Sequence, residues 1–485
     1  MKPTPFFPAW QARLAPMGAR LTRTFQSLRA ATLSQLEDRF AGCVPDSLFP
    51  KAPDHANSRD RIYTRWRTFW SMFWQSLNPA ATGREVVRQI QALLQLHGGP
   101  QISPDDGAYC RAKQRLPLCA FPKALAATAQ AAEAAAPALT LLQGRPLKLV
   151  DGSTVTLPDT PPNRAAYPSS QSPQPNFPLM RIVVLFSLCS GAILSLAQGS
   201  LHVAELPLLG LLLEQLVRGE ILLGDRGFGN YVVLALLQIR GVDFIGRSAR
   251  RVDGRCRLKR LGKNDWWVLW RKGSTPSSWL PWREWMGLPE QLTVRVIRGR
   301  VYQKGFRVRQ VTLVTTLLDA QRYPAAEILQ AYVRRWRLEM CLDDLKTTLE
   351  MEMLRSRSPE MAQKELFVRL MGHNLIRLVM AQAAREHAVA LDRISFKGSL
   401  DALRQFTQAM AQARSKKKRG ALWDELLRSL AVDLVPARPG RREPRAVKRK
   451  RNKYPRLSAP RGQFRDRPKR SVRRTKARMR RLGLK

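Results

Sequence analysis

Four side chains that could bind phosphate and a metal ion lie within residues 325–350. The spacing of the leucines in this segment predicts a helix. The four side chains are Tyr332, Arg335, Glu339 and Lys346. At about 100° per residue, all four fall within about 60° of one another around the helix axis. A carboxylate binds hard cations, and Arg and Lys bind phosphate groups. The row therefore suits a face that binds phosphate and metal, although Glu/Arg/Lys rows are more often solvated i,i+4 pairs.

Two aspartates end short apolar segments elsewhere in the chain. Asp151 follows the residues LKLV, and Asp225 follows ILLG. Sites gather at strand ends in α/β sheets. Together with Glu339, these acids predict a three-carboxylate site that suits two Mg²⁺ or Mn²⁺ ions and favours phosphodiester chemistry. Taken singly, an Asp before Arg-Gly is more often a turn residue.

The charge of the chain points to a polyanionic partner. Its 485 residues include 83 Lys and Arg against 37 Asp and Glu, a net charge of +46. Nucleic acid is the first candidate and an anionic membrane surface the second. The six cysteines form no C-x-x-C pair, which argues against a zinc site and fits a reducing cytoplasm. The longest uncharged apolar run, residues 182–197, is shorter than the ~20 residues of a membrane helix, so we expect a soluble protein without a membrane partner.

The periodicity of the chain predicts four regions. Residues 1–130 read as a small, basic helical domain, for which binding to DNA ends is a hypothesis. Residues 140–400 alternate strands and helices, with a β-rich insertion at 250–320. Residues 401–437 are predicted to be helical. The tail at 438–485 carries 22 Lys and Arg and two acids, hence 22 − 2 = +20, and we expect it to be disordered alone and to contact phosphate backbones.

The predicted insertion is rich in tryptophan. Its WWVLW run reads as one strand, in which alternation places Trp266 and Trp270 on one face and Trp267 on the other. Core packing is the expected role for most tryptophans of this segment.

These motifs together resemble the DDE transposases of bacterial insertion sequences. Tyr332, Arg335, Glu339 and Lys346 match the Y-(2)-R-(3)-E-(6)-K signature of one group in that family. DGST, beginning at Asp151, is similar to its first acidic motif, and DRGF, beginning at Asp225, to its second. The β-rich segment before the Glu is a further mark of this group. The resemblance spans residues 60–400 and does not include the basic tail.

The resemblance implies a fold, a reaction and roles for these residues. The fold would be an RNase H-like α/β core, with Asp151, Asp225 and Glu339 as catalytic metal ligands for two Mg²⁺ or Mn²⁺ ions. The reaction would be cleavage at transposon ends and strand transfer into target DNA, in relatives by way of a hairpin. Tyr332, Arg335 and Lys346 would hold the phosphate near the 5′ end. The DNA-binding candidates that would stack a flipped base are Trp266, Trp267 and Trp270.

Two other functions remain open from the sequence. One is a nuclease that cuts without joining, and the other is a catalytically silent, DNA-binding relative. The presence of Asp151, Asp225 and Glu339 argues against the silent form. For the transposase we expect double-stranded DNA as partner, a homodimer on that DNA, and a cytoplasmic, nucleoid-associated location.

Overall fold

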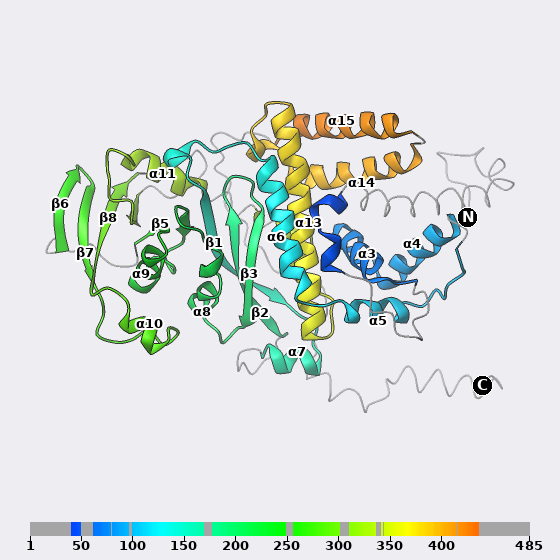
Figure 1. Cartoon of the computed structure of the whole chain (residues 1–485), viewed down its shortest axis with the longest axis horizontal. Coiled ribbons are helices and arrows are strands. Elements are labelled where there is room, and N and C mark those ends of the chain that lie inside the picture. The colour runs from blue at the N-terminus through cyan, green and yellow to red at the C-terminus, as the bar shows by residue number, and fades with distance from the viewer. Residues whose placement is uncertain are drawn as a thin grey trace, which may run out of the picture.

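The structure is a computed structural model of the whole chain, drawn in Figure 1. The described residues are 40–49, 62–78, 80–96, 99–168, 177–248, 256–300, 310–335, 341–342, 344–413 and 415–435. Glu339, the basic tail and the first 39 residues lie outside them. In the described ranges, no helix is both long and apolar enough to cross a membrane.

The described strands form one mixed sheet. They are β1 (Leu147–Thr156), β2 (Leu179–Ser187), β3 (Ile193–Ser200), β4 (Ile221–Gly224), β5 (Asp243–Arg247), β6 (Arg257–Gly262), β7 (Asp265–Arg271), β8 (Gln291–Gly299) and β9 (Val311–Thr315). Their order is β3-β2-β1-β4-β5-β9-β8-β7-β6. Strands β4 and β5 run parallel to β1, and every other pairing is antiparallel. The fold is therefore α/β with a nine-stranded, mostly antiparallel sheet.

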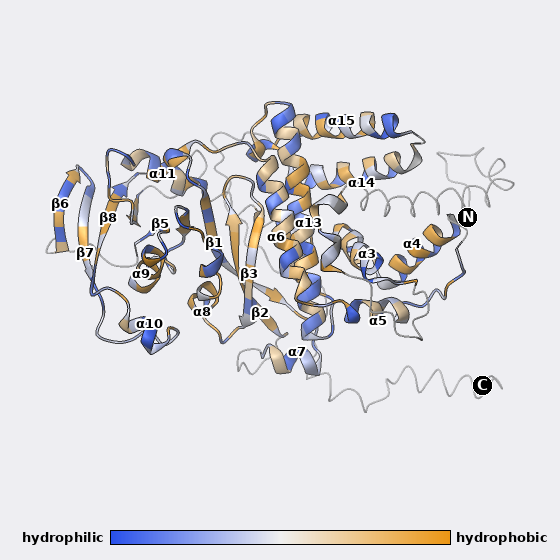
Figure 2. Ribbon diagram, in the orientation of Figure 1, coloured by the Kyte–Doolittle hydropathy of each residue, from blue (hydrophilic) through white to orange (hydrophobic). Residues whose placement is uncertain are grey.

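Helices cover both faces of the sheet (Figure 1). They are α3 (Arg65–Leu77), α4 (Gly83–Leu96), α5 (Gly107–Arg115), α6 (Ala120–Ala135), α7 (Pro161–Ala166), α8 (Glu205–Gly210), α9 (Tyr231–Ile239), α10 (Trp282–Met286), α11 (Ala325–Arg334), α13 (Pro359–Glu386), α14 (Phe396–Gln412) and α15 (Lys416–Val432). Helices α6 and α13 share a large apolar core with one face, and α8 and α9 share a second core with the other. In Figure 2 strand β2 is largely apolar, whereas the edge strand β6 is mostly hydrophilic.

The long helix α13 joins the N-terminal helices to the sheet. Asn374 of this helix accepts a hydrogen bond from the backbone N–H of Ile193 (2.7 Å) and donates to the carbonyl oxygen of the same residue (2.9 Å). It therefore satisfies the backbone of the edge strand β3. The buried Lys364 donates to the carbonyl oxygens of Lys113 and Gln114 at the end of α5. The core thus continues across residue 130, where the sequence predicted the end of a domain, and that domain division stays a prediction.

The aromatic residues of α3 belong to the core. Phe69, Trp70 and Phe73 are each at most 1% exposed, so these rings are packed inside the protein. Thr64 caps the helix by accepting a hydrogen bond from the N–H of Arg67.

The strands between β5 and α11 extend the central sheet. The sequence placed residues 311–315 within the insertion, but β9 pairs with β5 on one side and with β8 on the other. Only β6, β7 and β8 lie beyond it. Because β9 continues the hydrogen-bond ladder from β5, the outer strands are attached through backbone pairing as well as through side chains.

Candidate active site

The two aspartates lie at the same level of the sheet. Asp225 directly follows β4, as the sequence predicted, but Asp151 lies within β1, which continues to Thr156 because its second half stays paired with β2. Leu149 of β1 is paired with Leu223 of β4, so Asp151 and Asp225 each follow two residues later. The Oδ1 atom of Asp151 accepts a hydrogen bond from the N–H of Gly152 (2.9 Å). That of Asp225 accepts one from Gly227 (2.8 Å), which closes the turn after β4. Asp225 is therefore a turn residue and a neighbour of Asp151 at once.

The pKa of Asp151 shows how closely charged groups surround it. This pKa is raised overall from 3.8 to about 6, mainly by burial and to a smaller extent by the charges of Asp225 and Glu205. The N–H of Gly152 and the guanidinium of Arg335 act in the opposite direction. A buried carboxylate that faces other carboxylates favours either a proton or a cation.

Replacing Asp151 with Asn should stabilise the metal-free protein at neutral and higher pH. The folded-state pKa is raised to about 6 from 3.8, so stability present below pH 3.8 is lost as the pH rises through 6. Asn keeps the acceptor for Gly152 but carries no charge. In EDTA we expect a gain of about 1–3 kcal/mol in the free energy of unfolding at about pH 8 and a smaller gain at about pH 4.5. Urea titrations at both pH values test this, and an equal gain at both would contradict the assigned cause.

Two residues of the signature lie beside the aspartates. Tyr332 of α11 is 2% exposed, and Arg335, directly after that helix, is 8% exposed. The Cζ atom of Arg335 lies 5.5 Å from the centroid of the Tyr332 ring. Burial raises the pKa of Tyr332, with a smaller contribution from the charge of Asp225, while Arg335 lowers it. The structure thus brings Asp151, Asp225, Tyr332 and Arg335 together.

Lys346 does not lie on the regular α-helix that the sequence predicted for the signature. Helix α11 ends at Arg334, and Lys346 lies on a π-helix, Asp344–Thr348. A π-helix has more residues per turn, so the 100° spacing used to place Lys346 does not apply there. Lys346 is partly buried. Glu339 lies outside the described residues, and its place beside the aspartates stays a prediction.

The segment after the π-helix is attached to β1. Thr156 donates its N–H to the carbonyl oxygen of Glu352 (2.9 Å) and accepts a hydrogen bond from Leu354 (3.0 Å). Lys346 is thereby connected, through six residues of chain, to the strand that carries Asp151.

The three tryptophan candidates are engaged in packing. Trp266 and Trp270 are 8% and 5% exposed within the second core. Trp267 points to the other face, as alternation predicted, and its Nε1 donates to the carbonyl oxygen of Leu318 (3.0 Å). Stacking of a base on Trp266 or Trp270 would require these rings to leave the core. Trp282 of α10, which the sequence did not single out, is 62% exposed.

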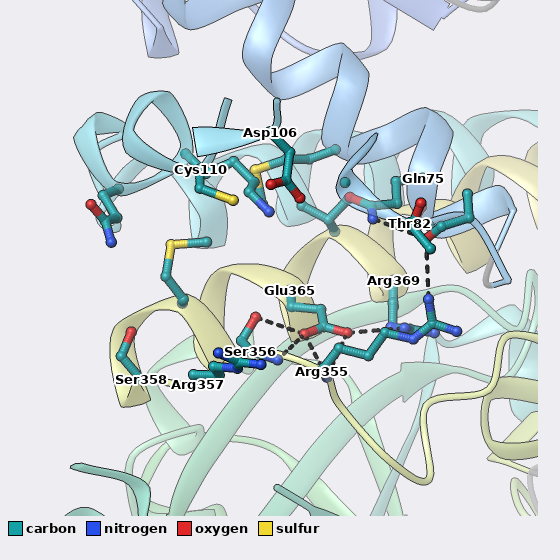
Figure 3. A pocket seen from close by; sticks show the side chains of 18 residues that line it. Gln75, Thr82, Asp106, Cys110, Arg355, Ser356, Arg357, Ser358, Glu365 and Arg369 are labelled. Atoms are coloured by element: carbon teal, nitrogen blue, oxygen red, sulfur yellow. Dashed lines mark hydrogen bonds and ion pairs between the residues drawn. The ribbon is translucent and has the colours of Figure 1, made fainter. Parts of the chain in front are cut away.

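A cavity of about 680 Å³ lies where the N-terminal helices meet the start of α13 (Figure 3). Glu365 stands in its wall and accepts hydrogen bonds from the N–H groups of Arg355 and Ser356 and from the guanidinium of Arg369. Burial raises the pKa of Glu365, but Arg369 and these donors outweigh it and lower the pKa overall. Neither Asp151 nor Asp225 lines this cavity. Glu365 therefore fixes the segment after the π-helix and is separate from the aspartate pair.

The donor chemistry at the aspartates fits a hard divalent ion. Carboxylate oxygens are the ligands that Mg²⁺ prefers. The Oγ atom of Ser153, two residues beyond Asp151 on β1, is buried and lacks a hydrogen-bond partner among the described residues. Within those residues, no three His, Cys, Asp or Glu side chains are gathered closely enough to hold an ion. The predicted third ligand, Glu339, is not among them.

Sequence reasoning missed two charged residues at this site. Glu205 of α8 and Arg247 of β5 act electrostatically on Asp151 and Tyr332, respectively. Neither belongs to a recognisable motif. A Glu that opens a helix and an Arg that ends a strand are common, so only the folded arrangement identifies them.

Two sequence comparisons with known proteins both match transposases. The family model described as a transposase DDE domain matches residues 142–375, a range that contains all six acidic and signature residues. The transposase InsG of insertion sequence element IS4 from Escherichia coli strain K12 is 28% identical over 403 residues, which cover 79% of this chain and 86% of that protein. A structure of the piggyBac transposase synaptic complex with hairpin DNA aligns with a TM-score of 0.38 at 11% identity, covering 79% and 80% of the two chains.

Proposed function

We propose that the chain is a DDE transposase of the kind found in bacterial insertion sequences, which cleaves the ends of its element and joins them to target DNA at Asp151, Asp225 and Glu339. The observation that carries the proposal is the parallel pairing of β1 with β4, which places Asp151 on β1 near Asp225 directly after β4, with Arg335 and Tyr332 acting on them electrostatically. Two acids and a cation at one place suit a phosphodiester whose charge increases during reaction.

Divalent metal ions are part of this proposal. Asp151 and Asp225, together with Glu339, would hold them. When bound, Mg²⁺ or Mn²⁺ activates the attacking water or 3′-hydroxyl and stabilises the leaving oxygen. The chain itself contributes the position of the acids, because the turn at Gly227 and the backbone pairing of β1 with β4 fix both carboxylates beside the end of β4.

The strand order supports an RNase H-like core. Three antiparallel strands, β3, β2 and β1, are followed by β4 and β5 parallel to β1. The first two acids then lie on β1 and directly after β4. We take β6, β7 and β8 as the insertion between the second acid and the helix that carries Tyr332.

Tyr332, Arg335 and Lys346 are proposed to hold the phosphate near the 5′ end of the cut strand. Replacing Arg335 with Ala should impair the hairpin or end-joining steps more than the first nick, by about 10–100-fold, because loss of a hydrogen bond to a charged group costs about 1.5–3 kcal/mol. Denaturing gels of single-turnover reactions separate the steps. Arg334→Ala, one residue earlier, is the control, and equal loss of nicking and later steps in Arg335→Ala would contradict the role.

The remaining DNA contacts are proposed from charge and sequence. The element's ends and target DNA are the partners, a homodimer brings two ends together, and the helices before residue 130 bind the ends. The tail at 438–485, with its net charge of +20, adds contacts to the phosphate backbone that weaken with salt. The proposed candidates for stacking on a flipped base remain Trp266, Trp267 and Trp270. Stacking requires that the ring concerned leaves its packed position.

The experiment that tests the function is a cleavage assay with purified protein and a duplex that carries the element's own ends. Metal-dependent nicking followed by joining to a second DNA is the expected result. Nicking without joining would favour the nuclease. Tight binding without nicking in Mg²⁺ or Mn²⁺ would overturn the proposal in favour of a silent DNA-binding relative.

A further inference from the structure

Two guanidinium groups lie over one indole ring in the outer strands of the sheet. The Cζ atoms of Arg257 and Arg298 are 4.5 and 5.6 Å from the centroid of the Trp266 ring, distances typical of cation–π contacts. Trp266 lies on β7, and the two arginines come from β6 and β8, the strands on either side of it (Figure 1). The sum of the two distances, about 10 Å, is the largest separation that the guanidinium centres can have.

No carboxylate balances this pair of charges in the part of the chain that the structure describes. Residues 256–300 contain ten Lys and Arg against three acids, hence 10 − 3 = +7. Two of the acids, Asp265 and Glu290, are held in ion pairs by other cations. The third, Glu284, lies on α10 and pairs with neither arginine. The outer strands therefore present an excess of positive charge.

The edge strand β6 extends this positively charged surface. Its first four residues, Arg257 to Arg260, are all exposed, and three of them are cationic. The Nζ atom of Lys259 lies 5.2 Å from the centroid of the Trp267 ring, on the other face of the sheet. Charged residues on an edge strand commonly prevent pairing with other chains. That explanation accounts for β6 but not for Arg298, because β8 is two strands in from the edge.

Packing on Trp266 does not by itself explain two arginines. One guanidinium over an indole ring gains from the cation–π attraction and shields the ring from water. A second guanidinium at the same ring gains the same attraction but is repelled by the first, because like charges at this separation destabilise each other. Trp266 is 8% exposed, whereas Arg257 is exposed and Arg298 is half-buried, so both charges lie between a packed ring and the solvent. An anion on the solvent side relieves the repulsion.

We propose that Arg257 and Arg298, held over the ring of Trp266, bind phosphate groups of the backbone of double-stranded DNA. This inference rests on the proposed function, in which DNA is the partner, and it assigns part of the DNA contact to the outer strands. Duplex DNA carries one negative charge per about 1.7 Å of its axis, so two cations at most about 10 Å apart meet several phosphates. The planar guanidinium suits phosphate recognition. Trp266 is then a positioning residue that acts through the arginines.

Binding of the full-length chain to DNA in EDTA, measured over a range of salt concentrations, tests this role without cleavage. The probe is a duplex that carries the element's own ends. The double variant Arg257→Gln/Arg298→Gln should bind about 10–100-fold more weakly. The slope of log affinity against log salt should fall by about 2, because each lost phosphate contact retains about one counterion on the DNA. A random duplex of the same length should lose as much, since backbone contacts carry no sequence information.

The matched control removes two arginines from another part of the surface. Arg218 directly precedes the turn into β4, and Arg240 follows α9. Arg218→Gln/Arg240→Gln changes the net charge of the chain by the same amount and should bind with wild-type affinity and slope. If both double variants weakened binding equally, the effect would come from net charge alone, and the site at Trp266 would be refuted.

Trp266→Leu separates the positioning of the arginines from direct stacking on a base. If the ring holds the guanidiniums, this change should weaken duplex binding in the wild type and have no further effect in Arg257→Gln/Arg298→Gln, because the residues act as one unit. An equal loss in both backgrounds would show that the ring contacts DNA directly and would overturn the positioning role. Should Trp266→Leu not fold, the arginine variants decide the inference alone.

Failure of the inference differs from failure of the proposed function. If Arg257→Gln/Arg298→Gln binds with wild-type affinity and slope while the wild type cleaves and joins, the outer strands do not contact phosphate and the proposed function stands. A wild type that binds DNA but does not nick it refutes the proposed function, whatever the arginine variants do. Should the double variant not fold, Arg257→Gln alone should lower the slope by about 1, and an unchanged slope overturns the inference.

Discussion

Replacing Asp225 with Asn should abolish cleavage at the element's ends while leaving the fold and DNA binding intact. Asn is as large as Asp and still accepts the hydrogen bond from Gly227 that closes the turn after β4. What it loses is the negative charge that a metal ion requires. Since a bound ion supplies several kcal/mol of transition-state stabilisation, the loss in rate should be about 10³-fold or more. Single-turnover cleavage of a labelled duplex measures the rate.

A second aspartate in the same kind of turn provides the control. The Oδ1 atom of Asp319 accepts hydrogen bonds from the N–H groups of Gln321 (2.9 Å) and Arg322 (3.0 Å). Asp319→Asn therefore changes charge and turn chemistry in the way that Asp225→Asn does, but away from Asp151. It should cleave normally. If Asp225→Asn retained wild-type nicking, Asp225 would be a turn residue only, and the proposed metal site would lose one of its two described ligands.

The aspartate pair was predictable because local and long-range signals agree. Asp151 and Asp225 each follow a short apolar run, and such runs form buried strands. Their juxtaposition follows once the two strands lie side by side and parallel. Alternation along β7 likewise predicted correctly that Trp267 faces away from Trp266 and Trp270. In each case a two-residue period, which the strand imposes, was sufficient.

Features that depend on contacts between distant segments were not predictable. The approach of Glu205 to Gly152 depends on how α8 packs on β1, which no spacing within either segment reveals. The pairing of β9 with β5 depends on strand order, and the sequence placed this strand in the insertion. The helix after Arg335 was extrapolated at a constant 100° per residue, an assumption that the π-helix at Lys346 does not meet.

A buried ion pair connects the outer strands to the start of the helix that carries Tyr332. Arg295 of β8 is fully buried, and its guanidinium binds both carboxylate oxygens of Asp265 on β7, at 2.9 and 2.6 Å. The same guanidinium donates to the carbonyl oxygen of Tyr323 (2.7 Å), just before α11. Since α11 carries Tyr332, this one side chain fixes both the pairing of the outer strands and the start of a helix at the site.

Replacing Asp265 with Ala should lower the free energy of unfolding by about 3–5 kcal/mol, because it leaves the charge of Arg295 buried without a counter-charge. Urea unfolding followed by circular dichroism measures the change. The double variant Asp265→Ala/Arg295→Met removes both charges and should recover most of the loss, since an apolar pair can replace a buried ion pair at little cost.

An exposed ion pair serves as the control that tests whether burial of Arg295 causes the loss of stability. Glu425 and Arg428 on α15 are 46% and 64% exposed in their side chains and form a similar two-pronged contact. Glu425→Ala should leave stability unchanged, because water solvates the charge that remains. If Asp265→Ala behaved like Glu425→Ala, water would reach Arg295, and the pair could not hold the start of α11 in place. A large loss in Asp265→Ala alone, recovered in the double variant, would show that the outer strands position the helix of Tyr332 through a single buried guanidinium.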